Sequence, residues 1–265
     1  MGSNLSLGEN PVVEIVVGYA GGYDRETMRP FCRSLKNTGF QGKVILFADG
    51  GGAEEAERHG FDVRPCPPLR MKIHSDRFLS IAEVLPENKA GVVCLDTRDV
   101  IFQTNPKYLP SDYIHVFEED GGQTIGSCPY NSSWIKLGYG DDEFKALRNR
   151  PILCVGSICG ESAMVKNYLT LMVKELKRIQ PNTGEPQDQA VHNHLCHAFQ
   201  NTPLGPRQWK NEESPIYTVG YIRPRETVEI KGDLILNRAG NVPAVIHQWD
   251  RHQNLSALVR RLYLD

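Results

Sequence analysis

The chain has 265 residues, of which 40% are hydrophobic and 23% charged, with a formal net charge of −2 at pH 7. This length is enough for one large α/β domain, and the near-neutral charge gives no reason to expect nucleic acid or a membrane surface as partner. No apolar run reaches the roughly 18 residues that a membrane-spanning helix needs, so we expect no transmembrane segment. Seven cysteines in mostly apolar surroundings indicate reduced thiols. Reduced thiols favour a cytoplasmic protein. A soluble domain excised from a Golgi enzyme would have much the same sequence features and is the alternative.

The first half of the chain alternates between strand and helix patterns. Residues 1–10 are polar and are expected to be disordered, and residues 11–265 are expected to form a single domain. Short β-rich runs predict strands at 11–20, 42–49, 61–68 and 90–96, and helical spacing predicts helices at 24–39, 52–60 and 75–87. Strand–helix alternation of this kind predicts parallel βαβ units and hence a doubly wound sheet.

The rhythm changes after residue 102. Strands are predicted at 113–120, 152–160, 226–230, 234–237 and 244–249, and helices at 161–180 and 187–199. Residues 131–149 form a polar, aromatic region, and residues 128–140 are predicted to be a loop. The turn sequence RAGN, residues 238–241, predicts a hairpin between the last two strands. The expected fold class is therefore mixed α/β, with a mainly parallel sheet, flanking helices and a C-terminal hairpin.

Two aspartates stand where an apolar strand leaves the predicted sheet. Asp96 follows the run VVCL directly, and Asp99 comes three residues later, before a second apolar run. Ligands of open parallel sheets bind at the carboxyl ends of the strands, but residues three apart share a side only if the chain turns between them. Mg²⁺ and Mn²⁺ take carboxylate oxygens together with phosphate, so the pair suits a cation bound to a diphosphate. Arg98 could contact a phosphate or pair with its neighbours, and a capped surface turn is the alternative.

The stretch Asp96-Thr97-Arg98-Asp99 resembles the D-x-D-type motif of GT-A glycosyltransferases, in which an apolar strand delivers aspartates to the metal of a nucleotide-sugar. It is one residue longer, so the resemblance leaves open which aspartate ligates directly. HSDRFLSIAEVL, EPQDQAVHNHL and AVIHQWDRH resemble further stretches of such enzymes in the same chain order. The resemblance implies a GT-A, Rossmann-like fold, a nucleoside-diphosphate sugar as donor, and Mn²⁺ or Mg²⁺ as cofactor.

The same resemblance implies roles for individual residues. Arg77 would contact the nucleotide, and Asp188 with Gln189 would lie at the sugar. His247 would complete the metal site with the two aspartates, as a histidine does in glycogenin-like enzymes. The expected reaction is transfer of a sugar, from a uridine diphosphate donor, to a glycan or other hydroxyl acceptor. By analogy, the Asp-Gln pair favours retention at the anomeric carbon.

Other candidates rest on residue chemistry. Asp188 could act as base, nucleophile or stabiliser, with Glu185 and Asp250 as reserve carboxylates, although a carboxylate at a helix N-terminus is also favoured by the helix dipole. Tyr19 could line a base pocket after the first strand. Trp134 and Trp249 could stack on sugar rings, and the alternative for Trp134 is packing within its own loop.

Three further hypotheses compete with the main one. A sugar-phosphate nucleotidyltransferase would share fold and metal, but its glycine loop is only faintly matched by Gly21, Gly22 and Arg25. An inert sugar-nucleotide-binding module would keep the aromatic residues. The HNHLCH run, residues 192–197, invites a zinc hypothesis, yet its ligand pairs point to different sides of a helix, so structural histidines are favoured. Cys154 and Cys159 are interpreted as core thiols, because no histidine lies near them in the sequence.

Overall fold

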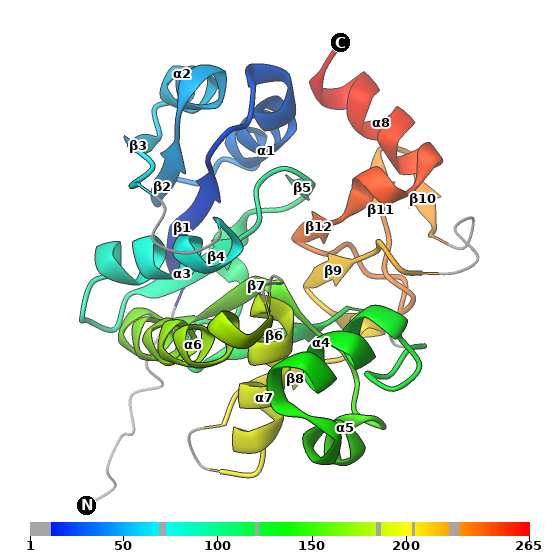
Figure 1. Ribbon diagram of the computed structural model, residues 1–265. Helices are drawn as coiled ribbons and strands as arrows, with labels where there is room; N and C mark the ends of the chain where they lie inside the picture. Colours follow the sequence, from blue (N-terminus) through cyan, green and yellow to red (C-terminus); the bar gives the residue numbers. More distant parts are fainter. Residues whose placement is uncertain (1–11, 69–72, 120–121, 184–186, 203–204, 223–227) are drawn as a thin grey trace, which may run out of the picture.

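A computed structural model describes residues 12–68, 73–119, 122–183, 187–202, 205–222 and 228–265 (Figure 1). The segment that was expected to be disordered, residues 1–10, lies outside the described residues. The architecture is mixed α/β, built on a seven-stranded sheet in the order β3-β2-β1-β4-β7-β6-β8. Its strands are β1 (Val13–Ala20), β2 (Lys43–Ala48), β3 (Asp62–Arg64), β4 (Gly91–Leu95), β6 (His115–Glu118), β7 (Leu153–Glu161) and β8 (Arg207–Trp209).

The direction of the strands confirms the mostly parallel sheet. β1 pairs in parallel with β2 and β4, β2 with β3, and β6 with β8, whereas β7 is antiparallel to both of its neighbours. The inner strands β1, β2 and β4 are buried on both faces, which explains why they read as nearly continuous apolar runs. The architecture is compatible with a single Rossmann-like domain.

Helices cover the two faces of the sheet (Figure 1). Ile15 and Val17 of β1 face a core formed with α3 (Ile73–Val84), α6 (Ser162–Thr183) and α7 (Asp188–Phe199), whereas Val16 faces a core that includes α1 and α2. The bounds of the remaining helices are α1 (Arg25–Asn37), α2 (Gly50–Arg58), α4 (Pro129–Tyr139), α5 (Asp141–Leu147) and α8 (Gln253–Tyr263), with three-residue 3₁₀ helices η1 (Pro106–Tyr108), η2 (Asn211–Glu213) and η4 (Trp249–Arg251). Within the described residues, no helix combines the length and apolar character that crossing a bilayer requires.

A second sheet of three strands corrects the expected C-terminal hairpin. Its central strand β12 (Val245–His247) pairs antiparallel with β5 (Val100–Phe102) and in parallel with β9 (Ile216–Thr218), so both of its edges are occupied. The hairpin lies earlier, between β10 (Ile230–Lys231) and β11 (Leu234–Ile235). RAGN does form a turn, closed by a bond from Asn237 N–H to the Asn241 carbonyl, but it leads from one sheet into another.

Residues 128–140, predicted as a loop, contain α4 instead, and the polar, aromatic region continues through α5. Gly140, with φ of 87°, separates the two helices. Ile135 and Leu147 are buried in a small cluster with Ile125 and Ile152. Trp134, Tyr139 and Phe144 also pack against this cluster, and the polar residues between them obscured the helical spacing.

Candidate metal and phosphate site

The turn between β4 and β5 brings the two aspartates together. β4 ends at Leu95 and β5 begins at Val100, and the four residues between them are not part of a strand. The Thr97 hydroxyl donates to the Tyr19 carbonyl at the end of β1, at 3.0 Å. Gly18 makes room for this contact, since a Cβ there would lie 2.5 Å from Thr97 Cγ2. The turn is therefore anchored to the carboxyl end of β1, where ligands of parallel sheets bind.

His247 reaches the same place from the end of β12. Its pairing with Val100 puts it beside the turn, and its Nε2 lies 3.5 Å from Asp96 Oδ2 and 3.5 Å from Asp99 Oδ1. The Nε2 atom is buried and has no hydrogen-bond partner in the described part of the chain. One ligand atom from each of the three residues lies within 4.8 Å of the others. This metal triad, defined as Asp96, Asp99 and His247, is the set predicted from the sequence.

A glycine on β7 leaves space for the triad. A Cβ at Gly156 would lie 2.5 Å from Asp96 Oδ2 and 2.6 Å from His247 Cε1. The Gly156 carbonyl also accepts the Asp96 backbone N–H at 2.8 Å, so β7 fixes the main chain of the turn. Gly156 was not identifiable from the sequence, because nothing local distinguishes it from a packing glycine.

Opposite charges in the triad shift the pKa values of its members in opposite directions. Burial works to raise the pKa of Asp96, but Arg77 and His247 outweigh it and hold that pKa well below its usual range. Burial opposes the imidazolium of His247 too, yet Cys154 and both aspartates hold its pKa well above the ordinary value. The raised pKa favours the imidazolium form of His247 in the cation-free protein, with its Nε2 facing both carboxylates. A divalent cation would replace the proton on Nε2, so binding would release it.

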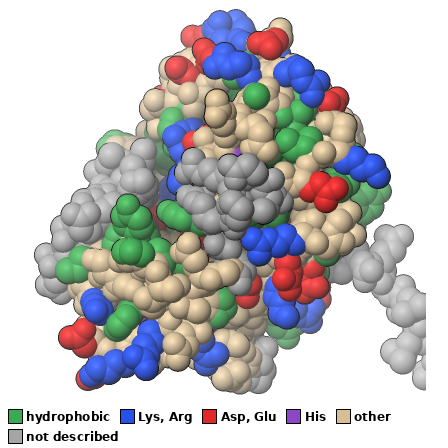
Figure 2. Space-filling model, turned by 90° about the vertical axis from the view of Figure 1, so that its right-hand side faces the viewer, with side chains coloured by type: hydrophobic (Ala, Val, Ile, Leu, Met, Phe, Trp, Pro, Cys, Tyr) green, Lys and Arg blue, Asp and Glu red, His purple; other side chains and the backbone are tan. Residues whose placement is uncertain are grey.

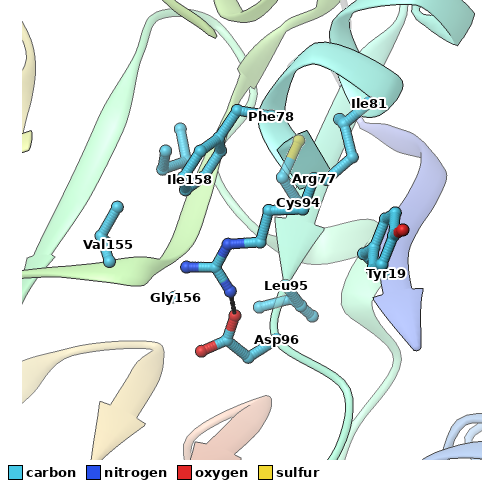
Figure 3. A pocket seen from close by; sticks show the side chains of 10 residues that line it. All are labelled: Tyr19, Arg77, Phe78, Ile81, Cys94, Leu95, Asp96, Val155, Gly156 and Ile158. Carbon is cyan, nitrogen blue, oxygen red and sulfur yellow. Dashed lines mark hydrogen bonds and ion pairs between the residues drawn. The ribbon is translucent and has the colours of Figure 1, made fainter. Parts of the chain in front are cut away.

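Arg77 links the triad to Asp188. Its guanidinium forms an ion pair with Asp96 and a second one with Asp188 Oδ2, at 3.0 Å. Figure 3 shows the side chain extending from α3 toward Asp96, with Tyr19 and Gly156 lining the same cavity. This cavity has a volume of about 20 Å³, which is room for a water molecule.

A second group of charges lies on the outer side of the triad. Arg98 Nη2 is 3.0 Å from Asp250 Oδ2 and 3.5 Å from Asp99 Oδ2, and Arg251 Nη2 is 4.0 Å from Asp99 Oδ2. The side chains of Arg98 and Arg251 are 46% and 37% exposed. Figure 2 shows basic, acidic and histidine side chains together beside the grey residues at the centre of one face of the molecule. Arg251 was missed at the sequence level, although it directly follows Asp250.

Asp188 and Gln189, the predicted sugar-binding pair, lie in different environments. Asp188 begins α7, is 8% exposed, and faces Arg77. The Gln189 carboxamide is occupied by the backbone of β7: its Oε1 accepts Val155 N–H at 3.0 Å and its Nε2 donates to the Leu153 carbonyl at 3.0 Å. Gln189 therefore fixes the start of α7 against β7 and so sets the position of Asp188.

The remaining candidates are distributed around these groups. The Tyr19 ring is buried and stacks on Phe47, with centroids 5.9 Å apart. Trp249 packs against the core that contains Ile246 of β12. Trp134 lies on α4, where its ring centroid is 6.0 Å from that of Tyr130, and it packs on the small cluster there. Glu185 lies outside the described residues.

No protein-family model matches the chain, and no curated protein matches it significantly. Any assignment of function consequently depends on the geometry and chemistry of the site itself.

Proposed function

We propose that this protein is a metal-dependent glycosyltransferase, using a nucleoside-diphosphate sugar as donor and a glycan or small-molecule hydroxyl as acceptor. The observation that carries the proposal is the metal triad, which converges at the carboxyl ends of β1 and β4 with two half-exposed arginines beside it. A cation and an adjacent phosphate-binding group are what a leaving nucleoside diphosphate needs, because its negative charge must be stabilised.

The residues of the triad fit a divalent cation. Two carboxylates and an imidazole would leave coordination positions for phosphate oxygens and water, and His247 Nε2 faces both carboxylates without forming a hydrogen bond in the described part of the chain. An imidazole ligand favours Mn²⁺ over Mg²⁺, because affinity for nitrogen donors rises along the transition series. When bound, the cation would supply Lewis-acid stabilisation of the leaving diphosphate.

The charges around the triad suit an anionic ligand only when the cation is present. Four carboxylates face three guanidinium groups and one imidazole: Asp96, Asp99, Asp188 and Asp250 against Arg77, Arg98, Arg251 and His247. With the imidazole protonated, the formal charge of this cluster is 0, and a divalent cation that displaces the proton would make it +1. We therefore expect the diphosphate to bind well only with the cation, with Arg98 and Arg251 as its side-chain partners.

Asp188 is the carboxylate that we place at the sugar. The Arg77 ion pairs connect it to Asp96, so it lies near the cation but does not belong to the triad. In this position it can act as a base on the acceptor, or as a nucleophile or stabiliser at the anomeric carbon. Retention of configuration is favoured only by the resemblance of the Asp188-Gln189 pair to retaining enzymes.

The nucleotidyltransferase alternative receives no support from the glycine loop. The Gly22 backbone N–H donates to Asp49 Oδ1 at 2.8 Å, and Arg25 forms an ion pair with Glu54 of α2. The backbone N–H and the guanidinium that would hold a triphosphate are thus already bound to carboxylates at the start of α2 and within it. This alternative and the inert binding module are decided by the experiment below.

Thermal stability with a panel of nucleotides, with and without Mn²⁺, tests the proposal. A ligand at 100 times its dissociation constant raises the stability by about 2.7 kcal/mol. We expect a rise in Tm with uridine diphosphate that needs Mn²⁺ and is lost in Asp99→Asn. A rise confined to triphosphates would indicate the nucleotidyltransferase instead.

Hydrolysis of the nucleotide-sugar, measured in parallel, distinguishes an enzyme from a binding module. Slow Mn²⁺-dependent hydrolysis by the wild type, lost in Asp188→Asn while nucleotide binding persists, is the expected result. Binding without any turnover in the presence of acceptor mixtures would support the inert module. If no nucleotide changes Tm with any cation, the proposal is wrong.

A further inference from the structure

The far side of His247 contacts two groups that the proposed function does not use. Cys154 Sγ on β7 lies 3.5 Å from His247 Nδ1, and Thr218 Oγ1 on β9 lies 3.4 Å from the same atom. Cys154 is 2% exposed and Thr218 is fully buried. Folding has therefore placed a histidine beside Cys154, which the sequence analysis treated as a plain core thiol.

The two ring nitrogens of His247 have different surroundings. Nε2 faces Asp96 and Asp99 and lacks a hydrogen-bond partner in the described part of the chain, whereas Nδ1 faces a sulfur and a hydroxyl. A neutral imidazole that binds a cation through one nitrogen carries its proton on the other, and this N–H needs an acceptor. In metal sites that acceptor fixes both the tautomer and the orientation of the ring.

We propose that Cys154 and Thr218 are positioning residues of the metal site. Their sulfur and hydroxyl oxygen accept the Nδ1–H of His247, which keeps the lone pair of Nε2 directed at the cation. This inference deepens the proposed function, since it rests on the same cation site.

The main chain holds both acceptors in place. Thr218 is the parallel register partner of His247, so β9 and β12 fix their separation. The Thr218 carbonyl in turn accepts the Asn211 side-chain N–H at 2.8 Å. Cys154 lies on β7, two residues before the glycine that borders the triad. Three strands from distant parts of the chain thus converge on one imidazole, which is more than packing of a buried ring requires.

Removal of both acceptors tests the inference, with Mn²⁺ affinity measured without nucleotide and in the absence of turnover. Outer-shell partners of metal-binding histidines change affinity by about 10- to 100-fold, so we expect a loss of that size in the double variant Cys154→Ala/Thr218→Val. Cys154→Ser keeps an acceptor and is expected to stay within about threefold of the wild type. The visible absorption of bound Co²⁺ should change in the double variant, because it reports the orientation of the ligands.

Cys159→Ala is the matched control. Cys159 is fully buried on the same strand, five residues further along, and packs in the core that includes α1 and α2. We expect its cation affinity and Co²⁺ spectrum to match those of the wild type. An unchanged affinity in a folded double variant, alongside a large loss in His247→Ala, would overturn this inference alone. Failure of the wild type to bind any divalent cation would overturn the proposed function as well.

Discussion

Among the described residues, the histidines of α7 and His247 at the end of β12 are partly or fully buried, and of these only His247 has the features of a ligand site. On α7, His192 Nδ1 lies 2.7 Å from the Tyr168 hydroxyl, His197 Nε2 contacts the Pro151 carbonyl at 3.0 Å, and His194 pairs with Glu143. His247, at the end of β12, instead directs a buried and unpartnered Nε2 between two carboxylates.

This difference shows what separates a structural histidine from a candidate ligand. The HNHLCH run has the more suggestive sequence, yet its polar atoms are satisfied by neighbouring side chains and backbone. Among the described residues, the metal triad is the one set whose ligand atoms converge. An unsatisfied buried nitrogen is therefore more informative here than the local density of histidines.

The largest expected effect is the loss of cation binding on removal of a triad residue. We predict that Asp99→Asn or His247→Ala weakens Mn²⁺ binding by more than about 100-fold, since even outer-shell partners contribute about 10- to 100-fold. Isothermal titration of the nucleotide-free protein measures this. His194→Ala provides the contrast, with affinity unchanged; a comparable loss there would move the metal site to α7.

The second prediction concerns the pH dependence of stability, and it sharpens the structural interpretation of α7. Burial lowers the pKa of His192 from 6.5 to about 3. Below pH 6.5 His192 binds a proton in the unfolded chain but not in the native state. The free energy of unfolding therefore decreases as the pH is lowered through this range, by as much as about 1.4 kcal/mol per pH unit. Between pH 7 and pH 5 the loss is about 2 kcal/mol from this residue.

Urea unfolding at these two pH values, in the presence of a chelator, measures the slope. His192→Gln should reduce the pH-dependent loss by about 2 kcal/mol while lowering stability at pH 7, because Tyr168 loses its partner. The same slope in the variant and the wild type would show that His192 is protonated in the native state.

A third and smaller effect is expected at the glycine that borders the triad. In Gly156→Ala the new methyl group would displace Asp96 or His247, and we expect Mn²⁺ affinity to fall roughly tenfold, as for a disturbed outer shell. Gly138→Ala is the control. A Cβ at this position would lie 3.1 Å from Cδ1 of Ile179, the flexible end of that side chain, and alanine favours the helix. Equal Mn²⁺ affinity in both variants would mean that the triad tolerates displacement.

The smallest effect is predicted for the exposed arginine beside the triad. Arg98→Ala should weaken binding of uridine diphosphate in the presence of Mn²⁺ by roughly three- to tenfold, because exposed ion pairs contribute about 1 kcal/mol or less and charged hydrogen bonds somewhat more. The effect should shrink at high salt. Arg178→Ala on α6, another exposed arginine, should leave nucleotide affinity unchanged; equal losses in the two variants would argue against a phosphate contact at Arg98.

Much of the fold was predictable because its inner strands are buried on both faces. The runs that form β1, β2 and β4 are apolar and short, and each is followed by a helix or turn signal, so local pattern identified them. The apolar run VVCL predicted that Asp96 lies at the end of β4, and the late strand pattern AVIHQW predicted the position of His247.

What the sequence did not reveal depends on contacts between distant segments. β12 was assigned to a hairpin because strand pairing is decided by which edge is available, and its partners β5 and β9 were not identifiable locally. The roles of Cys154, Gly156 and Thr218 arise only when three strands meet at His247. The helices α4 and α5 were missed because their short apolar faces are interrupted by polar and aromatic residues.

The most direct test of the central claim is pulsed electron paramagnetic resonance of Mn²⁺ bound to the protein. The account predicts modulation from one imidazole nitrogen in the wild type, absent in His247→Gln and retained in His192→Gln. The absence of bound Mn²⁺ in the wild type, or a nitrogen signal that persists in His247→Gln, would contradict it.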